Sequence, residues 1–171
     1  MVMKKTIVGL LIAALLFCAA GCGADSGAQP ADGGAETTAQ PSADAVVLGS
    51  VMQEMLDTVT LPEMMTLTQD DLLDYFGLEP QWCADSAACI NANGFEKDEI
   101  ILVRAADKQS VPQIQSCLET VLENAAAEMQ DYLPQQYAMI RGCKVESRDL
   151  YVWLFISDSA DPLRAVLDKY V

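Results

Sequence analysis

Carboxylates are the side chains with which this chain could do chemistry, because it contains no histidine. Glu96, Asp98 and Glu99 flank a predicted turn, and two carboxylates placed there could act as general acid and base, as in glycoside cleavage. Charged residues at the start of a strand are more often only solvated, and Lys97 lies among these three. Without histidine, neither a Ser-His-Asp nor a Cys-His arrangement can be built. We therefore expect no enzyme, and keep an enzyme of carboxylate or thiolate type as the minor alternative.

A second acidic group, Asp70, Asp71 and Asp74, falls within one predicted helical turn. Hard cations such as Ca²⁺ prefer several carboxylate oxygens, so these three are the candidates for a metal site. Acids in the first turn of a helix also complement its dipole, and the spaced acids of an EF-hand loop are missing. We favour the helix-dipole interpretation and expect neither a metal nor another cofactor.

The segment 157–161, SDSAD, links the last predicted strand to the last predicted helix. A helix N-terminus in such a loop can hold an anion. Its two aspartates would repel that anion, and hydroxyls and acids before Pro162 are what a helix start requires. The sequence therefore favours a helix start over an anion site.

Three aromatic residues, Trp82, Tyr132 and Tyr137, are candidates for contacts with a partner. Exposed aromatic side chains often anchor protein partners. Burial in the core is the commoner role for such residues, so the sequence alone leaves the partner-binding surface open.

Four cysteines, Cys83, Cys89, Cys117 and Cys143, belong to the predicted folded part. Cys83 and Cys89 would lie about 20 Å apart on one strand, too far for a disulfide. Cys117 falls on the apolar side of a predicted helix, and no CxxC spacing indicates zinc. We favour buried free thiols, while disulfides and a metal site remain open alternatives.

The N-terminus has the pattern of a bacterial lipoprotein signal peptide. Lys4 and Lys5 precede an apolar run that ends in small residues before Cys22. We expect residues 1–21 to be removed and Cys22 to carry a lipid that anchors the protein in the membrane. Ordinary secretion and an uncleaved anchor are the alternatives. Residues 22–44 contain no large apolar side chain, which predicts a disordered linker.

The charge of the chain limits its partners. The formal net charge is −15, and removal of residues 1–21, which carry two lysines and no acid, brings it to −15 − 2 = −17. Such an excess of acids repels nucleic acids, so we exclude them as partners.

Residues 45–171 have enough apolar residues for a single domain. Periodicity predicts helices over 45–58, 69–76, 110–130, 133–141 and 161–170. Periodicity and turn residues predict strands over 82–90, 99–106, 143–147 and 150–157. The strand 99–106 is apolar on both faces and should be central. The second helix should bury Leu72, Leu73, Tyr75 and Phe76. The expected fold is α+β, with a four-stranded sheet made of two β-hairpins and covered by helices.

Several short segments, taken in order and with their spacing, resemble a family of lipoproteins from clostridia-like Gram-positive bacteria. They are Tyr75-Phe76-Gly77-Leu78, Asp98-Glu99-Ile100, Tyr132-Leu133-Pro134 with Gln136-Tyr137, and Tyr151-Val152 followed by Ser157-Asp158. The family is known as domain-of-unknown-function family 4358. The resemblance implies a short exported α+β domain on a lipid anchor, and it implies no activity and no catalytic residues.

These features together lead to one functional expectation. We expect a lipid-anchored protein on the extracytoplasmic face of the cell membrane that binds or organises another envelope protein without catalysis. The alternative is a module that captures a small ligand or a divalent cation.

Overall fold

The computed structural model describes residues 46–171. The predicted signal peptide, the lipidation site Cys22 and the linker 22–44 lie outside the described residues. Within the described part, no helix is long and apolar enough to cross a membrane.

The sheet is antiparallel and has five strands, so the prediction of four was wrong. The two predicted hairpins are present; their strands are β2 (Cys83–Asn91), β3 (Glu99–Ala105), β4 (Val145–Arg148) and β5 (Tyr151–Ile156). The additional strand, β1 (Met64–Thr66), pairs with the outer edge of β2. The strand order is β1-β2-β3-β5-β4, which confirms that β3 is central.

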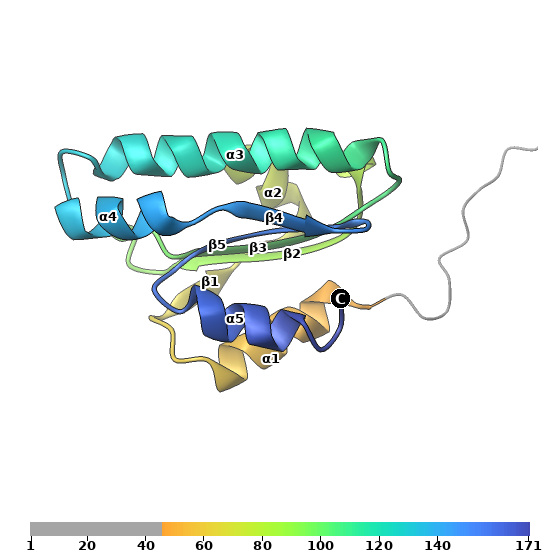
Figure 1. Cartoon of the computed structure of the whole chain (residues 1–171), viewed down its shortest axis with the longest axis horizontal. Helices are drawn as coiled ribbons and strands as arrows, with labels where there is room; N and C mark the ends of the chain where they lie inside the picture. Colours follow the sequence, from red (N-terminus) through yellow and green to blue (C-terminus); the bar gives the residue numbers. More distant parts are fainter. Residues whose placement is uncertain (1–45) are drawn as a thin grey trace, which may run out of the picture. The chain divides into compact units, whose positions relative to one another are not determined.

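Helices cover both faces of this sheet (Figure 1). One face carries α1 (Leu48–Thr58) and α5 (Ala160–Leu167). The other carries α2 (Gln69–Phe76), α3 (Ser110–Met129) and α4 (Pro134–Gly142). A short 3₁₀ turn, Pro80–Trp82, leads into β2. The predicted mixture of helices and sheet is therefore confirmed.

Two apolar cores form because successive residues of β3 point to opposite faces of the sheet. Ile101 and Val103 pack beneath α3, with Ile114 of that helix. Ile100 and Leu102 pack against α1 and α5. All four β3 residues are almost completely buried, as expected for a central strand with helices on both faces.

Local signals set the two ends of α2. The Thr68 side chain accepts a hydrogen bond from the Asp71 backbone N–H, and the Asp71 carboxylate accepts one from the Thr68 backbone N–H at 2.8 Å. The Thr68 hydroxyl also donates to the Asp71 carboxylate at 2.6 Å, and the bonds that this carboxylate accepts from Thr68 lower the pKa of Asp71. Gly77 follows the helix with φ +72°, a left-handed conformation that glycine adopts most readily. Asp71 is thus part of a capping box, whose role is structural.

Candidate functional site

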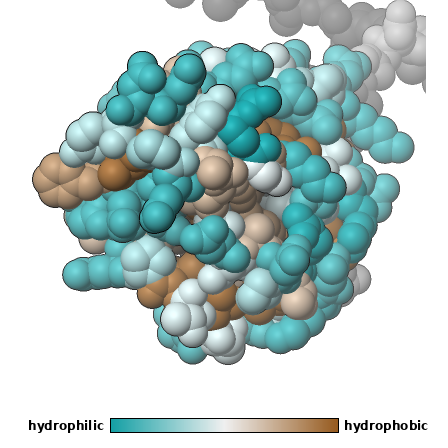
Figure 2. Space-filling view, turned by 60° about the vertical axis from the view of Figure 1, so that its left-hand side comes forward, coloured by the Kyte–Doolittle hydropathy of each residue, from teal (hydrophilic) through white to brown (hydrophobic). Residues whose placement is uncertain are grey.

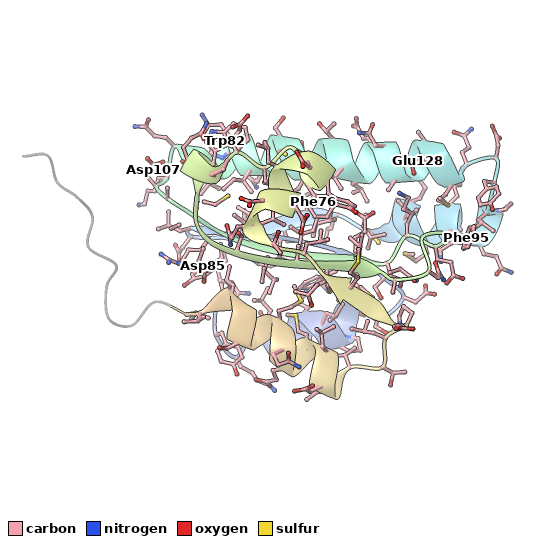
Figure 3. All side chains as sticks on the ribbon, turned by 180° about the vertical axis from the view of Figure 1, so that it is seen from behind. Phe76, Trp82, Asp85, Phe95, Asp107 and Glu128 are labelled. Carbon is pink, nitrogen blue, oxygen red and sulfur yellow. The ribbon has the colours of Figure 1, made fainter. Side chains whose placement is uncertain are left out.

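The sheet has two ends that can be told apart by labelled residues (Figure 3). Phe95 and Glu128 lie at one end, and Trp82 and Asp107 lie at the other. The first end, which we call the hairpin end, consists of the β2–β3 turn (92–98) with Glu99, β1, Tyr75 of α2, the last turns of α3, α4 and the residues that follow β5. The turn is joined to α4, since the Lys97 backbone N–H donates to Gln136 Oε1 at 3.1 Å.

Glu99 is the most unusual group of the hairpin end. It opens β3 opposite Ile156 of β5, and only 8% of its surface is exposed. Its Oε2 atom is buried and has no hydrogen-bond partner, while Oε1 lies 4.0 Å from Lys97 Nζ. Lys97 makes its closer ion pair, at 2.8 Å, with Glu128 of α3. Burial raises the pKa of Glu99, and nearby Lys97 only partly counteracts this.

Two clefts adjoin Glu99. The first, which we call the α3 cleft, has a volume of about 260 Å³ and is bounded by α2, the start of β3 and the last turns of α3. The second, the turn cleft, has a volume of about 290 Å³ and lies between β1, the end of α2 and the β2–β3 turn. Tyr75, Lys97 and Glu99 line both clefts, so these residues separate them.

The predicted carboxylate pair does not form a matched acid and base. Asp98 accepts a hydrogen bond from Asn91 Nδ2 at 3.0 Å. Burial raises the pKa of Asp98, and the Asn91 hydrogen bond counteracts this shift. Glu96 is exposed and accepts from Asn93 Nδ2 at 3.0 Å. Asp98 and Glu96 therefore stabilise the turn, and Glu99 is the carboxylate of the three without a hydrogen bond to its buried oxygen.

A hollow of about 520 Å³ lies between α4, the start of β4 and the start of α5. Figure 2 shows this side of the molecule, where apolar surface is enclosed by hydrophilic side chains. The Arg164 guanidinium of this hollow is already paired, since it forms ion pairs with Glu146 and, at 2.8 Å, with Asp161. This arrangement leaves no unpaired guanidinium for an anion.

The predicted loop 157–161 contributes to the same hollow but acts as a helix start. Ser157 Oγ accepts a hydrogen bond from the Ser159 backbone N–H at 3.1 Å. Cys143 also lines the hollow, and burial raises the pKa of its thiol. A thiol with a raised pKa is a poor nucleophile, so the hollow lacks an activated sulfur.

The other acidic candidates are not brought together. Asp71 serves the capping box, and Asp70 and Asp74 are exposed. Among residues 46–171, no group of three His, Cys, Asp or Glu side chains could hold a metal ion.

The aromatic candidates have different environments. Trp82 and Tyr137 are partly buried and pack against the core beneath α3. Tyr132 is 61% exposed in the loop between α3 and α4. Of the three, Tyr132 is therefore the one that presents most of its ring to a partner.

All four cysteines of the described chain are free thiols. Burial raises the pKa of Cys89 to about 12 and that of Cys83 to about 11. The Cys117 thiol donates to the Phe76 carbonyl at 3.0 Å. Within residues 46–171, these groups pack as buried or hydrogen-bonded thiols whose pKa is raised by burial.

Sequence reasoning missed the exposed apolar side chains of α2, β1 and the β2–β3 turn. Tyr75 and Leu73 were expected on the buried side of α2, but Tyr75 is 55% exposed and Leu73 is also exposed. Phe95 is 66% exposed in the β2–β3 turn, and Met65 is exposed on β1. The spacing along α2 indicates this exposure, because Leu72 and Phe76 are four residues apart and fill the single buried stripe of this short helix. Leu73 and Tyr75 lie outside that stripe.

Comparison with known proteins identifies the family but no function. Neither a curated protein nor a solved structure matches the chain. One family profile matches residues 57–157, which is more than half of the chain and includes every strand and most of the helices. The resemblance noted in the sequence is thereby confirmed, and the chain belongs to the family described as a domain of unknown function, DUF4358.

Proposed function

We propose that this protein is a lipid-anchored, extracytoplasmic binding module whose hairpin end docks a basic segment of another envelope protein. The N-terminal sequence supports the anchor, with Cys22 as its attachment point. A clickable fatty acid should label the full-length chain in cells, and Cys22→Ala should abolish the label. Label retained by Cys22→Ala would contradict the proposed anchor.

The proposed docking surface rests on one observation, the combination of acidic and apolar side chains around the two clefts. Glu96, Asp98, Glu99 and Glu128 line them, and Lys97 is the one basic side chain in either lining. Exposed Met65 and Tyr75 line the same surface, and exposed Phe95 projects from the adjoining turn. Exposed aromatic and aliphatic side chains supply binding energy, and the surplus of carboxylates favours a basic partner.

The position of the N-terminal end of the described domain supports this assignment. The backbone N–H of Leu48, the first residue of α1, donates to Asp85 Oδ2 at 2.9 Å. Asp85 lies toward the end of the sheet opposite Phe95 (Figure 3). The chain therefore enters the domain far from the hairpin end, which leaves that end unobstructed by its own attachment point.

Site-specific photo-crosslinking in living cells tests the proposal. A photo-reactive amino acid would replace Phe95 in the full-length chain, with Lys108 as the matched control position. Lys108 is also exposed, and it follows Asp107 at the opposite end. We expect one envelope protein to be crosslinked from position 95 and not from position 108. Equal crosslinking from both positions, or none from position 95, would refute the docking surface.

Capture of a small ligand is the second candidate function, favoured by the presence of two clefts at one end of the sheet. Divalent cations fit these clefts less well, because the Lys97 ammonium already lies between Glu99 and Glu128. A small organic molecule with hydrogen-bond donors is the better match.

A further inference from the structure

The outer edge of β1 has backbone groups that the domain leaves unpaired. The Glu63 carbonyl accepts a hydrogen bond from the residue that follows β2 at 2.8 Å, and the Leu67 N–H donates to β2 at 2.9 Å. Alternate residues of an antiparallel strand bond to the same neighbour, so Met65, between these two, also faces β2. The N–H and C=O groups of Met64 and Thr66 therefore point away from the sheet, and within the described chain they make no hydrogen bond.

This edge is accessible to a partner. Figure 3 views the domain from behind, and there β1 lies in front of the other strands, with α2 on one side and α1 on the other. Met65 and Thr66 are exposed. Edge strands are commonly protected from pairing by charged side chains, which β1 lacks. An extended segment can therefore add to the sheet along β1 and bond to the outward groups of Met64 and Thr66.

The charges beside β1 favour a basic segment. Glu63 precedes the strand, and Glu96 lines the turn cleft together with Met65; both glutamates are exposed. Neither takes part in an ion pair within the part of the chain that the structure describes. The Lys97 ammonium is already paired, at 2.8 Å, with Glu128, which lines the α3 cleft and not the turn cleft. A second copy of this acidic chain would bring like charges together at β1, so we do not expect it as the partner.

The opposite edge of the sheet, β4, fits a basic segment less well. The Ala105 N–H donates to the carbonyl just before β5 at 2.8 Å, which fixes the alternation along β5. The outward groups of β4 are accordingly those of Val145 and Ser147. Lys144 and Arg148 lie on either side of these residues and would repel a basic segment. The β4 edge is therefore a matched control for β1.

We propose that the basic segment of the partner binds as an additional strand on β1, with its backbone paired to Met64 and Thr66. The inference deepens the proposed function and rests on it for the natural partner. Alternate side chains of the added strand would lie beside Met65 on one face of the sheet and beside Met64 on the other. Lysine or arginine on the first face would lie near Glu63, and apolar side chains suit the second, where Met64 packs against the core beneath α1.

Nuclear magnetic resonance titration of the full-length lipoprotein in detergent tests this proposal. The probe is the capped peptide Lys-Val-Lys-Val-Lys, and Glu-Val-Glu-Val-Glu is its analogue of opposite charge. Two further peptides carry N-methyl groups either on the valines or on the lysines. Because N–H groups alternate in direction along a strand, one of these sets would face β1 and the other would face water. The matched variants are Thr66→Pro and Ser147→Pro, which each remove one outward N–H, from β1 and from β4.

We expect saturable shifts of the amide signals of Met64 and Thr66 with the basic peptide and none with the acidic one. One N-methylated peptide should bind about tenfold more weakly than the other, because it lacks the hydrogen bonds to β1. Thr66→Pro should weaken binding about fivefold, and Ser147→Pro should leave it unchanged. The N-methylated peptides need no altered protein, so they test the proposal even if Thr66→Pro fails to fold. Equal binding by the two N-methylated peptides, shifts centred on β4, or no binding of the basic peptide would overturn the proposal.

The two proposals can fail separately. Peptide binding at β1 without a crosslinked partner at position 95 would support strand addition and refute the docking of an envelope protein. A crosslinked partner without peptide binding would support the docking surface and refute strand addition. Shifts of the Met64 and Thr66 signals that depend on protein concentration alone would identify a second copy of the chain on β1 and overturn the basic segment as its occupant.

Discussion

Substitution of Glu99 by Gln should stabilise the protein at neutral pH, against the usual effect of changing a buried residue. Gln has nearly the same shape but no charge, so the variant isolates the cost of ionising this carboxyl in the folded state. That cost arises because Oε2 is buried without a partner and Oε1 has only Lys97 at 4.0 Å.

The magnitude follows from the energetics of unpaired buried polar groups. Such a group costs about 1–3 kcal/mol, and a charged one more. Lys97 offsets part of this cost, so we expect Glu99→Gln to raise the free energy of unfolding by about 1–2 kcal/mol at pH 7. For a domain of this size, the melting temperature should rise by about 4–8 °C.

The effect should depend on pH in a defined direction. The pKa of Glu99 is raised above its ordinary value of 4.5, so between that value and the raised pKa the folded state binds more protons than the unfolded state. The stability of the unaltered protein therefore falls as the pH rises through this window, and its Glu99 contribution is constant above it. The advantage of Glu99→Gln should vanish below pH 4.5 and be complete well above the raised pKa.

Thermal unfolding followed by circular dichroism, from pH 4 to pH 8, would measure this difference on the full-length protein in detergent. Glu119→Gln is the control, because it removes an exposed charge and should not change the pH profile relative to the unaltered protein. The reasoning is refuted if Glu99→Gln destabilises the protein at pH 7, or if its effect is the same at pH 4 and pH 7.

Three further perturbations probe the packing of the domain. Gly77→Ala should cost about 1–2 kcal/mol, because the left-handed φ of +72° strains any Cβ although the nearest atom, Cys117 Sγ, would lie at an ordinary 3.9 Å. Chemical denaturation should detect this loss, and unchanged stability would mean that the end of α2 relaxes. Leu154→Ala should cost about 2–5 kcal/mol in the same assay, since Leu154 is fully buried beneath α3; a loss below 1 kcal/mol would contradict that packing. Cys89, buried and with a pKa of about 12, should resist iodoacetamide at pH 8 until the protein is unfolded, as mass spectrometry would reveal; rapid labelling in the native state would contradict its burial.

Elements with strong local signals could be predicted from the sequence. The limits of α2 were predicted correctly because Thr68 and Gly77 fix them through their own backbone and side-chain chemistry. The central position of β3 also followed from its composition, since an unbroken apolar run needs cover on both faces.

Strand β1 could not be predicted, because its pairing is not a local property. Met64–Thr66 is only three residues long, and it pairs with residues of β2 that lie about 25 positions further along the chain. The residues before and after this segment show no alternation of apolar and polar side chains that would distinguish a strand from a loop. The open edge of β2, which appears only once the sheet exists, is what makes this segment a strand.

The candidate site was predicted in part for the same reason. The sequence identified the acidic turn with Glu96, Asp98 and Glu99, because the three residues are adjacent. It could not indicate that Glu128 of α3 and Tyr75 of α2 would share a cleft with Glu99, since their proximity depends on how helices pack on the sheet. The burial of Glu99 likewise results from packing, because the residue stands at the end of a strand where charged side chains are commonly solvated.

The antiparallel pairing of β3 with β5 has a consequence for the order in which the chain folds. The β2–β3 and β4–β5 hairpins each close over a short turn, whereas β3 pairs with residues of β5 about fifty positions away, across α3 and α4. Closing that long loop costs entropy before its contacts are gained, so the two hairpins and α3 should form early and their association through β3 and β5 should limit the folding rate. Glu99 opposite Ile156 is the end pair of that junction, so the backbone pairing of Glu99 with β5 forms only in this slow step.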